Sequence, residues 1–303
     1  MRIVTRPDFD GVVCAVLIGD ALSIESPVRW VEPNDFKKGA VDIRPGDVVA
    51  NLPHHAACDI WFDHHSTNQA AVPFKGLFRP APSAARNVFD YFQGRFTRDY
   101  DELVYWADRI DSADFTQAEV LHPERTPHIL LSMTVSGENG NDEAYWNRLV
   151  ALLRASAIDR VMADPEVEAR CRRVVQENGE YAGWLRRYTR VVGEVAITDF
   201  RPLERPPSGN RFLSYSLFPE TVVSLRIRYE DAARATVVVN IGHSIFNPRC
   251  RVHAGRLLTA FGGGGHRGAA SARFPAEQAD RCIPQIVDAL VRNQDEPPGE
   301  PVA

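Results

Sequence analysis

The first part of the chain alternates short apolar runs with longer apolar segments. Three short runs predict buried strands, at residues 3–5, 48–52 and 59–62. Two longer segments predict helices, at residues 11–22 and 84–92. Strands that alternate with helices are typical of a parallel sheet covered by helices. We therefore expect an α/β fold over residues 1–140, doubly wound around a mainly parallel sheet.

Helical spacing dominates the middle of the chain. One helix face is marked by apolar residues at i, i+3, i+4 and i+7, namely Trp146, Leu149, Val150 and Leu153. Asp164 followed by Pro165 then predicts a second helix, with Asp as the N-cap and Pro in the first helical position. We expect residues 141–190 to form a helical connection between two domains.

The last third of the chain has strand patterns followed by helical ones. Residues 222–229 and 235–241 flank a short polar segment and predict a β-hairpin. An amphipathic helix that stops at four consecutive glycines comes next, and residues 276–292 predict a final helix. We expect a smaller α/β domain with a mixed sheet over residues 191–292. The tail at 293–303 is rich in Pro, Gly and Glu, a composition that predicts disorder.

Composition narrows the class of protein. The 303 residues are 44% hydrophobic and 25% charged, which suits two ordinary domains. No apolar run has the length of about 18 residues that a membrane span needs, so we expect no membrane partner. The five cysteines have no CxxC spacing, and the start of the chain lacks the pattern of a signal peptide. We therefore expect a reduced, cytoplasmic setting.

The charge of the chain is uneven. A net charge of −5 argues against a protein that coats long nucleic acids, because such binding needs a basic face. Between Arg201 and Cys282, however, twelve arginines stand against six acidic residues. A locally basic C-terminal part suits a small anionic ligand.

Acidic and histidine side chains gather in three groups, which we expect at the ends of strands. The groups are Asp8 with Asp10, Asp63 with His64 and His65, and Asp108 with Asp111. Carboxylate oxygens mixed with imidazole suit Mn²⁺, Fe²⁺ or Zn²⁺ better than Ca²⁺. Because the carboxyl ends of parallel strands meet at one edge of a sheet, the three groups predict a metal site.

A second candidate site lies at the glycine run of residues 262–265, which His266 and Arg267 follow. Consecutive glycines let backbone N–H groups approach an anion without obstruction by side chains. The histidine and the arginine would add donors for phosphate or carboxylate. We expect this loop to hold an anion.

The motifs of the N-terminal part resemble those of the DHH phosphoesterase superfamily, and the resemblance covers nearly the whole chain. Asp8-Phe9-Asp10-Gly11 is similar to the first motif, and Asp63-His64-His65 is similar to the signature triplet. Pro82-Ser83-Ala84-Ala85 is similar to the helix start that follows. The segment 106–112 resembles the fourth motif, with Asp111 aligned to the metal ligand and Asp108 as the fallback.

The motifs of the C-terminal part resemble the DHH-associated domain. Gly263-Gly264-Gly265-His266 is similar to its Gly-Gly-Gly-His motif. The segment Asn240-Ile241-Gly242-His243-Ser244, and Arg226 on the preceding strand, also match its pattern. The resemblance implies that this domain closes over the active site and binds the non-reacting end of the substrate. The implied substrate contacts are Arg226, His243, Gly263, Gly264, Gly265 and His266.

The resemblance also implies two Mn²⁺-like ions that clamp a phosphate and generate a nucleophilic hydroxide. The cofactor is then Mn²⁺, or another divalent ion such as Mg²⁺, Fe²⁺ or Co²⁺. The implied metal ligands are Asp8, Asp10, Asp63, His64 and Asp111. His65 is the implied catalytic residue.

Two positions depart from the family pattern. In the family a metal-binding histidine usually precedes the first acidic pair. This chain has Val4, Thr5 and Arg6 there instead. The aspartate that usually bridges both metals is replaced by Asn51. Both changes affect the same cation, so we expect a one-metal site. Asp10, His64 and Asp111 would hold the ion, with Asn51 as a weak neutral ligand. Arg6 would stand near Asp8, replace part of the missing charge and act as a catalytic residue. His54 and His55 are alternative ligands.

The expected activity is hydrolysis of a phosphodiester or phosphomonoester in a short oligonucleotide or a nucleotide-derived substrate. The partner would be this small phosphorylated molecule or a short single-stranded nucleic acid. The sequence leaves open whether the chain forms a homodimer. Two alternatives remain at this point. One is an exopolyphosphatase, and the other is a nucleotide- or phosphate-binding protein that has lost turnover.

Overall fold

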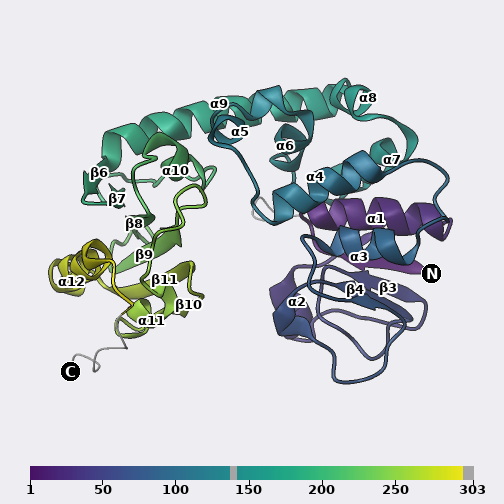
Figure 1. The fold of residues 1–303 in the computed structure, drawn as a ribbon, viewed down its shortest axis with the longest axis horizontal. Helices are drawn as coiled ribbons and strands as arrows, with labels where there is room; N and C mark the ends of the chain where they lie inside the picture. The colour runs from purple at the N-terminus through teal and green to yellow at the C-terminus, as the bar shows by residue number, and fades with distance from the viewer. Residues whose placement is uncertain (137–141, 296–303) are drawn as a thin grey trace. The chain divides into compact units, whose positions relative to one another are not determined.

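The computed structural model describes residues 1–136 and 142–295, and the chain divides into two compact units (Figure 1). The first unit consists of Met1–Phe115 and Pro123–Val174. The second begins with the short segment Thr116–His122 and continues from Val175.

The first unit is built on a sheet of five parallel strands in the order β2-β1-β3-β4-β5. Its strands are β1 (Arg2–Thr5), β2 (Arg29–Trp30), β3 (Asp47–Ala50), β4 (Ile60–Asp63) and β5 (Gly76–Phe78). The prediction of a parallel α/β sheet is confirmed. β2 and β5 lie at the two edges and were not predicted, because two or three residues are too few to show a period.

Helices cover this sheet. They are α1 (Phe9–Ala21), α2 (Pro33–Lys37), α3 (Ala84–Tyr91), α4 (Asp101–Asp111), α6 (Pro127–Ser132), α7 (Glu143–Ala155) and α8 (Ile158–Met162). α1 packs against β1, α3, α4 and α7, and nearly all of its residues are buried. This central position explains why its sequence is apolar on most faces. A second apolar cluster includes Phe36 of α2, Val49 and Trp61.

The prediction that Asp108 and Asp111 follow a strand is wrong. Both lie in the last turn of helix α4, whose buried residues Leu103, Val104 and Ala107 form one apolar face. The other two acidic groups do lie next to strands, because β1 leads directly to Asp8 and β4 ends at Asp63.

The second unit contains a sheet of six strands in the order β10-β11-β9-β8-β7-β6. Its strands are β6 (Thr189–Val192), β7 (Val195–Asp199), β8 (Val223–Tyr229), β9 (Thr236–His243), β10 (Gly264–Gly265) and β11 (Ala269–Pro275). Only the β7–β8 pair is parallel, so the expected mixed sheet and the expected hairpin of β8 and β9 are confirmed.

One face of this sheet is apolar and forms the core of the unit. Alternate residues of β7, β8, β9 and β11 pack with residues of α11 (Ala254–Thr259) and α12 (Ala279–Arg292). The residues between them, such as Arg226 and Asn240, are half-buried and belong to the opposite face. On that side α10 (Leu213–Leu217) packs against β8 and α5 (Gln117–Leu121).

The long helix α9 (Pro165–Tyr188) contains the point at which the two units divide. The Asp164 carboxylate accepts the backbone N–H of Glu166 at 3.1 Å, which confirms the predicted N-cap. α7 packs on α1, so this part of the expected connection is integral to the first unit. Most of the tail expected at 293–303 lies outside the described residues.

Among the described residues, no helix combines the length and the hydropathy that crossing a bilayer requires.

Candidate metal centre and substrate-binding surface

Three side chains from distant parts of the chain meet in the first unit. Asp10 in the first turn of α1, His64 after β4 and Asp111 at the end of α4 place one ligand atom each within 4.8 Å of one another. His64 Nε2 lies 3.2 Å from Asp111 Oδ2. Two carboxylates and one imidazole are a donor set that fits a divalent transition metal.

Asp10 is positioned by two neighbouring elements. Asp8 is the N-cap of α1 and accepts the backbone N–H of Gly11 at 2.8 Å, which fixes the start of the helix. The two carboxylate oxygens of Asp10 accept the backbone N–H groups of Ala84 and Ala85, at 2.9 and 2.8 Å. These donors belong to the first turn of α3, so Asp10 joins the N-termini of two helices.

His64 has the hydrogen bonding of a metal ligand. Its Nδ1 lies 2.9 Å from the carbonyl oxygen of Ala81, which selects the tautomer with the proton on Nδ1. Its Nε2 is buried and has no hydrogen-bond partner among the described residues. A lone pair on Nε2 therefore faces the two carboxylates, and a cation held between them would satisfy all three groups.

Asp111 lies where a helix disfavours a negative charge. It is the last residue of α4, at the negative end of the helix dipole. Asp108, one turn earlier, has protein partners instead. Its carboxylate accepts from Ser83 Oγ at 2.6 Å and from Arg86 Nε and Nη2 at 2.9 and 2.7 Å. The structure thus brings Asp111 into the cluster and leaves Asp108 outside it.

Burial opposes negative charge in this cluster. Desolvation raises the pKa of Asp8 to about 6, and it raises the pKa of Asp10 well above its ordinary value. The pKa of Asp111 is raised for the same reason, although His64 and His65 oppose the shift. A bound divalent cation would stabilise the charged carboxylates that these surroundings disfavour.

Arg6 and Asn51 surround Asp8 rather than Asp10. Arg6 Nε lies 3.1 Å from Asp8 Oδ2, and Asn51 Nδ2 donates to Asp8 Oδ1 at 3.0 Å. Both oxygens of Asp8 are therefore engaged by donors of the protein. Asn51 Oδ1 is buried and has no hydrogen-bond partner among the described residues.

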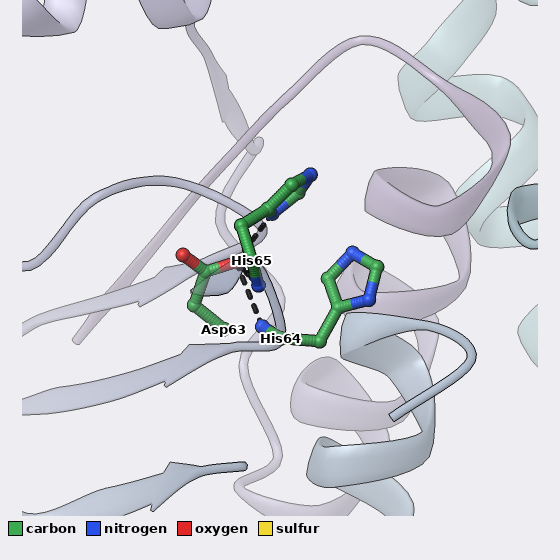
Figure 2. A group of neighbouring side chains, drawn as sticks. All are labelled: Asp63, His64 and His65. Carbon is green, nitrogen blue, oxygen red and sulfur yellow. Dashed lines mark hydrogen bonds and ion pairs between the residues drawn. The ribbon is translucent and has the colours of Figure 1, made fainter. Parts of the chain in front are cut away.

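Asp63 orients the histidine pair (Figure 2). It is fully buried and accepts from His65 Nδ1 at 2.7 Å, from the backbone N–H of His64 at 2.9 Å and from Asn68 Nδ2 at 2.7 Å. The carboxylate raises the pKa of His65 through this hydrogen bond. The ring of His64 is turned toward the neighbouring helices (Figure 2), and the rings of His64 and His65 lie edge to face with centroids 4.2 Å apart.

His54 and His55 lie outside the cluster. The ring of His54 packs edge-on against Trp61, with centroids 5.1 Å apart, and burial lowers its pKa. His55 Nδ1 accepts the backbone N–H of Ala57 at 3.2 Å. Both rings therefore serve the local packing of their loop.

A cavity of about 310 Å³ lies beside the cluster. It is lined by Arg6, Glu32, Pro33, Asn34, Asn51, Pro53, His65, Thr67 and Asn68. Arg6 and His65 would donate hydrogen bonds to an anion bound in this cavity. Their own desolvation would cost little, because both side chains are partly exposed.

In the second unit, Arg226 lies in a polar row that crosses the sheet. The strand register places Thr198 on one side of Arg226 and Asn240 on the other, and Ser271 follows Asn240. Arg226 Nη1 lies 3.4 Å from the hydroxyl of Tyr181, and Asn240 Nδ2 donates to Ser271 Oγ at 3.1 Å. This row offers donors for a polar ligand.

The glycine run does not present the open backbone N–H groups that were expected to hold an anion. Gly264–Gly265 is the short strand β10, paired with β11. The N–H of Gly263 donates to Leu258 O at 2.9 Å, and the N–H of His266 donates to Ala269 O at 2.8 Å. These donors are used by the fold because the turn has to close between α11 and β11. The glycines instead allow close packing, since a Cβ at Gly263 would lie 2.4 Å from Ser271 O.

The histidines of this unit lie apart from the polar row. His243 continues the alternation of Val239 and Ile241, and Gly268 lies against its ring. Its Nε2 is buried without a hydrogen-bond partner among the described residues, and burial lowers its pKa. His266 is exposed. His253 is the N-cap of α11, and its side chain accepts from the N–H of Arg256.

Several residues that hold the acidic side chains in and around the metal centre were not found from the sequence. Asn68 and Asn87 hold Asp63 through its carboxylate and its backbone carbonyl, and Arg86 holds Asp108. Polar side chains on helices carry no signal of such contacts. Ser83 did carry one, because a serine that begins a helix predicts an N-cap.

Comparison with solved structures identifies the fold. The chain is similar to the pGpG-specific phosphodiesterase PggH from Vibrio cholerae, with 29% identity, a TM-score of 0.86 and coverage of 96% of this chain and 99% of that one. No family model matches the chain, and no curated protein matches it by sequence.

Two more distant structures share the fold. RecJ from Thermus thermophilus, in complex with Mn²⁺, has 13% identity and a TM-score of 0.57, with coverage of 97% of this chain and 52% of that one. The DHH domain of a member of the s1p family of ribosomal proteins has 11% identity and a TM-score of 0.52, with coverage of 97% and 87%.

Proposed function

Since this chain belongs to the DHH superfamily, whose members include phosphate-ester hydrolases, we propose that it is a metal-dependent phosphodiesterase of short oligonucleotides. The observation that carries the proposal is the meeting of Asp10, His64 and Asp111, in which the buried His64 Nε2 makes no hydrogen bond within the described residues and lies 3.2 Å from Asp111 Oδ2. The substrate of first choice is pGpG, the linear 5′-phosphorylated guanine dinucleotide. The similarity to PggH over nearly the full length of both chains supports this choice.

Asp10, His64 and Asp111 would hold one divalent cation, with Asn51 Oδ1 as a neutral further ligand. Mn²⁺ suits this donor set, and Mg²⁺, Fe²⁺ or Co²⁺ are alternatives. When bound, such a cation supplies Lewis-acid polarisation of a phosphate and lowers the pKa of water. The hydrogen bond of His64 Nδ1 to Ala81 O holds the imidazole in the tautomer that ligation needs.

Arg6 would replace part of the charge of a second cation. Its guanidinium is bound to Asp8, which Asn51 also contacts, so this carboxylate is already neutralised by the protein. An arginine can hold a phosphoryl oxygen through paired donors, but it does not acidify water as a metal does. We therefore expect slower turnover than two cations would give.

His65 would serve as the proton donor to the leaving group. Its Nδ1 is bound to Asp63, so the opposite ring nitrogen is left for the substrate. The raised pKa keeps the imidazole protonated to higher pH. Asp63 would act as a positioning residue for His65 and for the backbone of His64.

The second unit would bind the substrate away from the reacting phosphate. Arg226, with Asn240 and Ser271 in the same row, offers donors for a phosphate or a base edge. Gly264 and Gly265 form the edge strand next to this row, with Gly263 and the exposed His266 on either side of it, and His243 ends β9.

Turnover of a small substrate panel tests the proposal. The panel contains pGpG, a cyclic dinucleotide, 3′-phosphoadenosine 5′-phosphate and polyphosphate, each with Mn²⁺, Mg²⁺ or EDTA. We expect hydrolysis of pGpG that EDTA abolishes and that His64→Ala reduces by at least about 100-fold. His55→Ala is the matched control, because this histidine lies outside the cluster, and it should retain activity.

Other results of this panel would contradict the proposal. Tight binding of a nucleotide without turnover under any metal would instead identify a binding protein with the same cleft. Preferred hydrolysis of polyphosphate would identify an exopolyphosphatase. Equal activity of wild type and His64→Ala would remove the proposed metal ligand.

A further inference from the structure

Arg226, the cation of the polar row, is held by a neutral group. Several other arginines of the second unit are paired with carboxylates, namely Arg201 with Asp199, Arg249 with Glu194, Arg267 with Asp295 and Arg273 with Glu230. Arg226 has no carboxylate partner within the described part of the chain. Its one side-chain hydrogen bond there is donated by Nη1 to the hydroxyl of Tyr181, at 3.4 Å.

A neutral acceptor leaves the charge of the guanidinium in place. A carboxylate would neutralise it, whereas the Tyr181 hydroxyl accepts from one of its five N–H donors and adds no charge. Arg228 follows two residues later on the same face of β8. Burial lowers the pKa of Arg228, and the positive charges of Arg226 and Arg273 lower it further. This part of the sheet therefore favours an anion.

The ring of Tyr181 is fixed by its surroundings. Tyr181 lies in α9 and is 3% exposed. The backbone of Gly209 lies against the ring, since a Cβ at Gly209 would be 2.4 Å from Tyr181 Cγ. The fully buried Phe200 is a further neighbour, with ring centroids 6.3 Å apart. A hydroxyl on a ring packed in this way is an acceptor with a fixed position.

Arg226 itself remains open to a ligand. It is half-buried and shares the polar face of the sheet with Asn240 and Ser271. A long side chain loses rotamer freedom when a ligand orders it, and this loss weakens binding by about three- to tenfold. A hydrogen bond that orders Arg226 before the ligand arrives reduces that loss.

We propose that Tyr181 is a positioning residue for substrate binding, because its hydroxyl orders the guanidinium of Arg226 and leaves its charge to a phosphate of the substrate. The inference rests on the proposed function, in which Arg226 binds the substrate away from the reacting phosphate. The buried Tyr181 acts through Arg226 and does not itself touch the substrate. It therefore affects binding and not the chemical step.

The variant Tyr181→Phe removes the hydroxyl and keeps the ring. We would measure its affinity for pGpG by calorimetry in EDTA, and its kcat and KM with Mn²⁺. The affinity should fall and KM should rise by about three- to tenfold, with kcat unchanged. A purely structural role would reduce the fraction of folded enzyme, and would lower the apparent kcat at an unchanged KM.

Two further variants show whether the effect passes through Arg226. In an Arg226→Gln background, Tyr181→Phe should weaken binding no further, because the guanidinium that it orders is gone. Tyr188→Phe is the matched control, since Tyr188 also lies in α9 and packs against Phe200, with centroids 6.0 Å apart. It should bind pGpG like wild type. Thermal unfolding of each variant checks that it is folded.

The possible results are distinct for the two proposals. Unchanged affinity in Tyr181→Phe, together with a loss in Arg226→Gln, would overturn the positioning role and leave the proposed function intact. An equal loss from Tyr181→Phe in both backgrounds would also overturn it. If Arg226→Gln bound pGpG like wild type, the positioning role and the proposed contact of Arg226 would both be wrong. A loss that the Arg226→Gln background removes would support the role even where pGpG is not hydrolysed, a result that contradicts the proposed function alone.

Discussion

At Asn51 the backbone has a φ of 55° and the side chain contacts Asp8, so one residue combines an unusual conformation with a place in the site. Asn and Asp tolerate this left-handed region better than other residues that carry a Cβ. The amide donates to a carboxylate that an aspartate at the same position would repel. The neutral side chain is therefore suited to a centre with fewer cations.

Replacing Asn51 with Asp tests that relation. Without metal, two carboxylates about 3 Å apart would repel each other, and we expect the free energy of unfolding to fall by about 1–3 kcal/mol. Mn²⁺ should restore it, because a cation between the two charges removes the repulsion. Thermal unfolding with EDTA and with Mn²⁺ measures both effects. Asn34→Asp, at an exposed position of the same cavity, should show neither.

The pair of Asp63 and His65 predicts a change in pH dependence. Asp63 raises the pKa of His65, so the proton that His65 donates is retained to higher pH. In Asp63→Asn the negative charge is gone and the pKa of His65 falls. The basic limb of kcat/KM should then move to lower pH, so that activity falls more at pH 8 than at pH 6.

The pH profile separates this role from a purely structural one. Loss of packing around Asp63 would lower kcat/KM equally at every pH, and an unshifted basic limb would contradict the proposed proton donor. Circular dichroism at both pH values checks that the variant is folded.

At the scale of elements, helix α4 shows what the sequence pattern left open. Its buried residues Leu103, Val104 and Ala107 have helical spacing, but the pattern covers little more than one turn. Asp108 and Asp111 were expected at the end of a strand because the other two acidic groups, at Asp8 and at Asp63, follow predicted strands. The chain therefore brings Asp111 to the site at the end of a helix rather than at the end of a strand.

Where α11 meets β10, a side chain at Gly255 would clash with the backbone of Gly265. A Cβ at Gly255 would lie 2.2 Å from Gly265 O, whereas a Cβ at Gly264 would meet no atom within 4 Å. Helix propensity alone favours Gly255→Ala by about 1 kcal/mol. Because the backbone carbonyl cannot move away, we expect this variant instead to lose about 1–3 kcal/mol in the free energy of unfolding. Urea unfolding measures the difference.

Gly264→Ala is the matched control for this junction. It should change the free energy of unfolding by no more than about 0.5 kcal/mol, since its new methyl group meets open space. A stabilised Gly255→Ala variant would show that α11 and the glycine strand are not tightly packed.

At the scale of the whole molecule, the order of elements was largely predictable and the contacts between them were not. Runs such as residues 48–52 and 84–92 carry their own periodicity, so β3 and α3 were found to within two residues. β2 and β10 have two residues each and owe their pairing to neighbours. The pairing of Asp10 with the start of α3 is likewise a tertiary contact with no local signal.

The metal centre was predictable in part for the same reason. Asp10, His64 and Asp111 stand in recognisable motifs, and the structure brings one ligand atom of each within 4.8 Å of the others. The buried state of His64 Nε2 and the contact of Asn87 with the backbone of Asp63 depend on residues far apart in the sequence. Such features follow from packing and need the folded chain.

Binding of one divalent cation by Asp10, His64 and Asp111 can be counted directly. Titration of metal-free protein with Mn²⁺, with free Mn²⁺ followed by electron paramagnetic resonance, counts the bound ions directly. We predict one equivalent per chain, lost in His64→Ala and retained in His55→Ala. Two equivalents in wild type, or one that persists in His64→Ala, would contradict it.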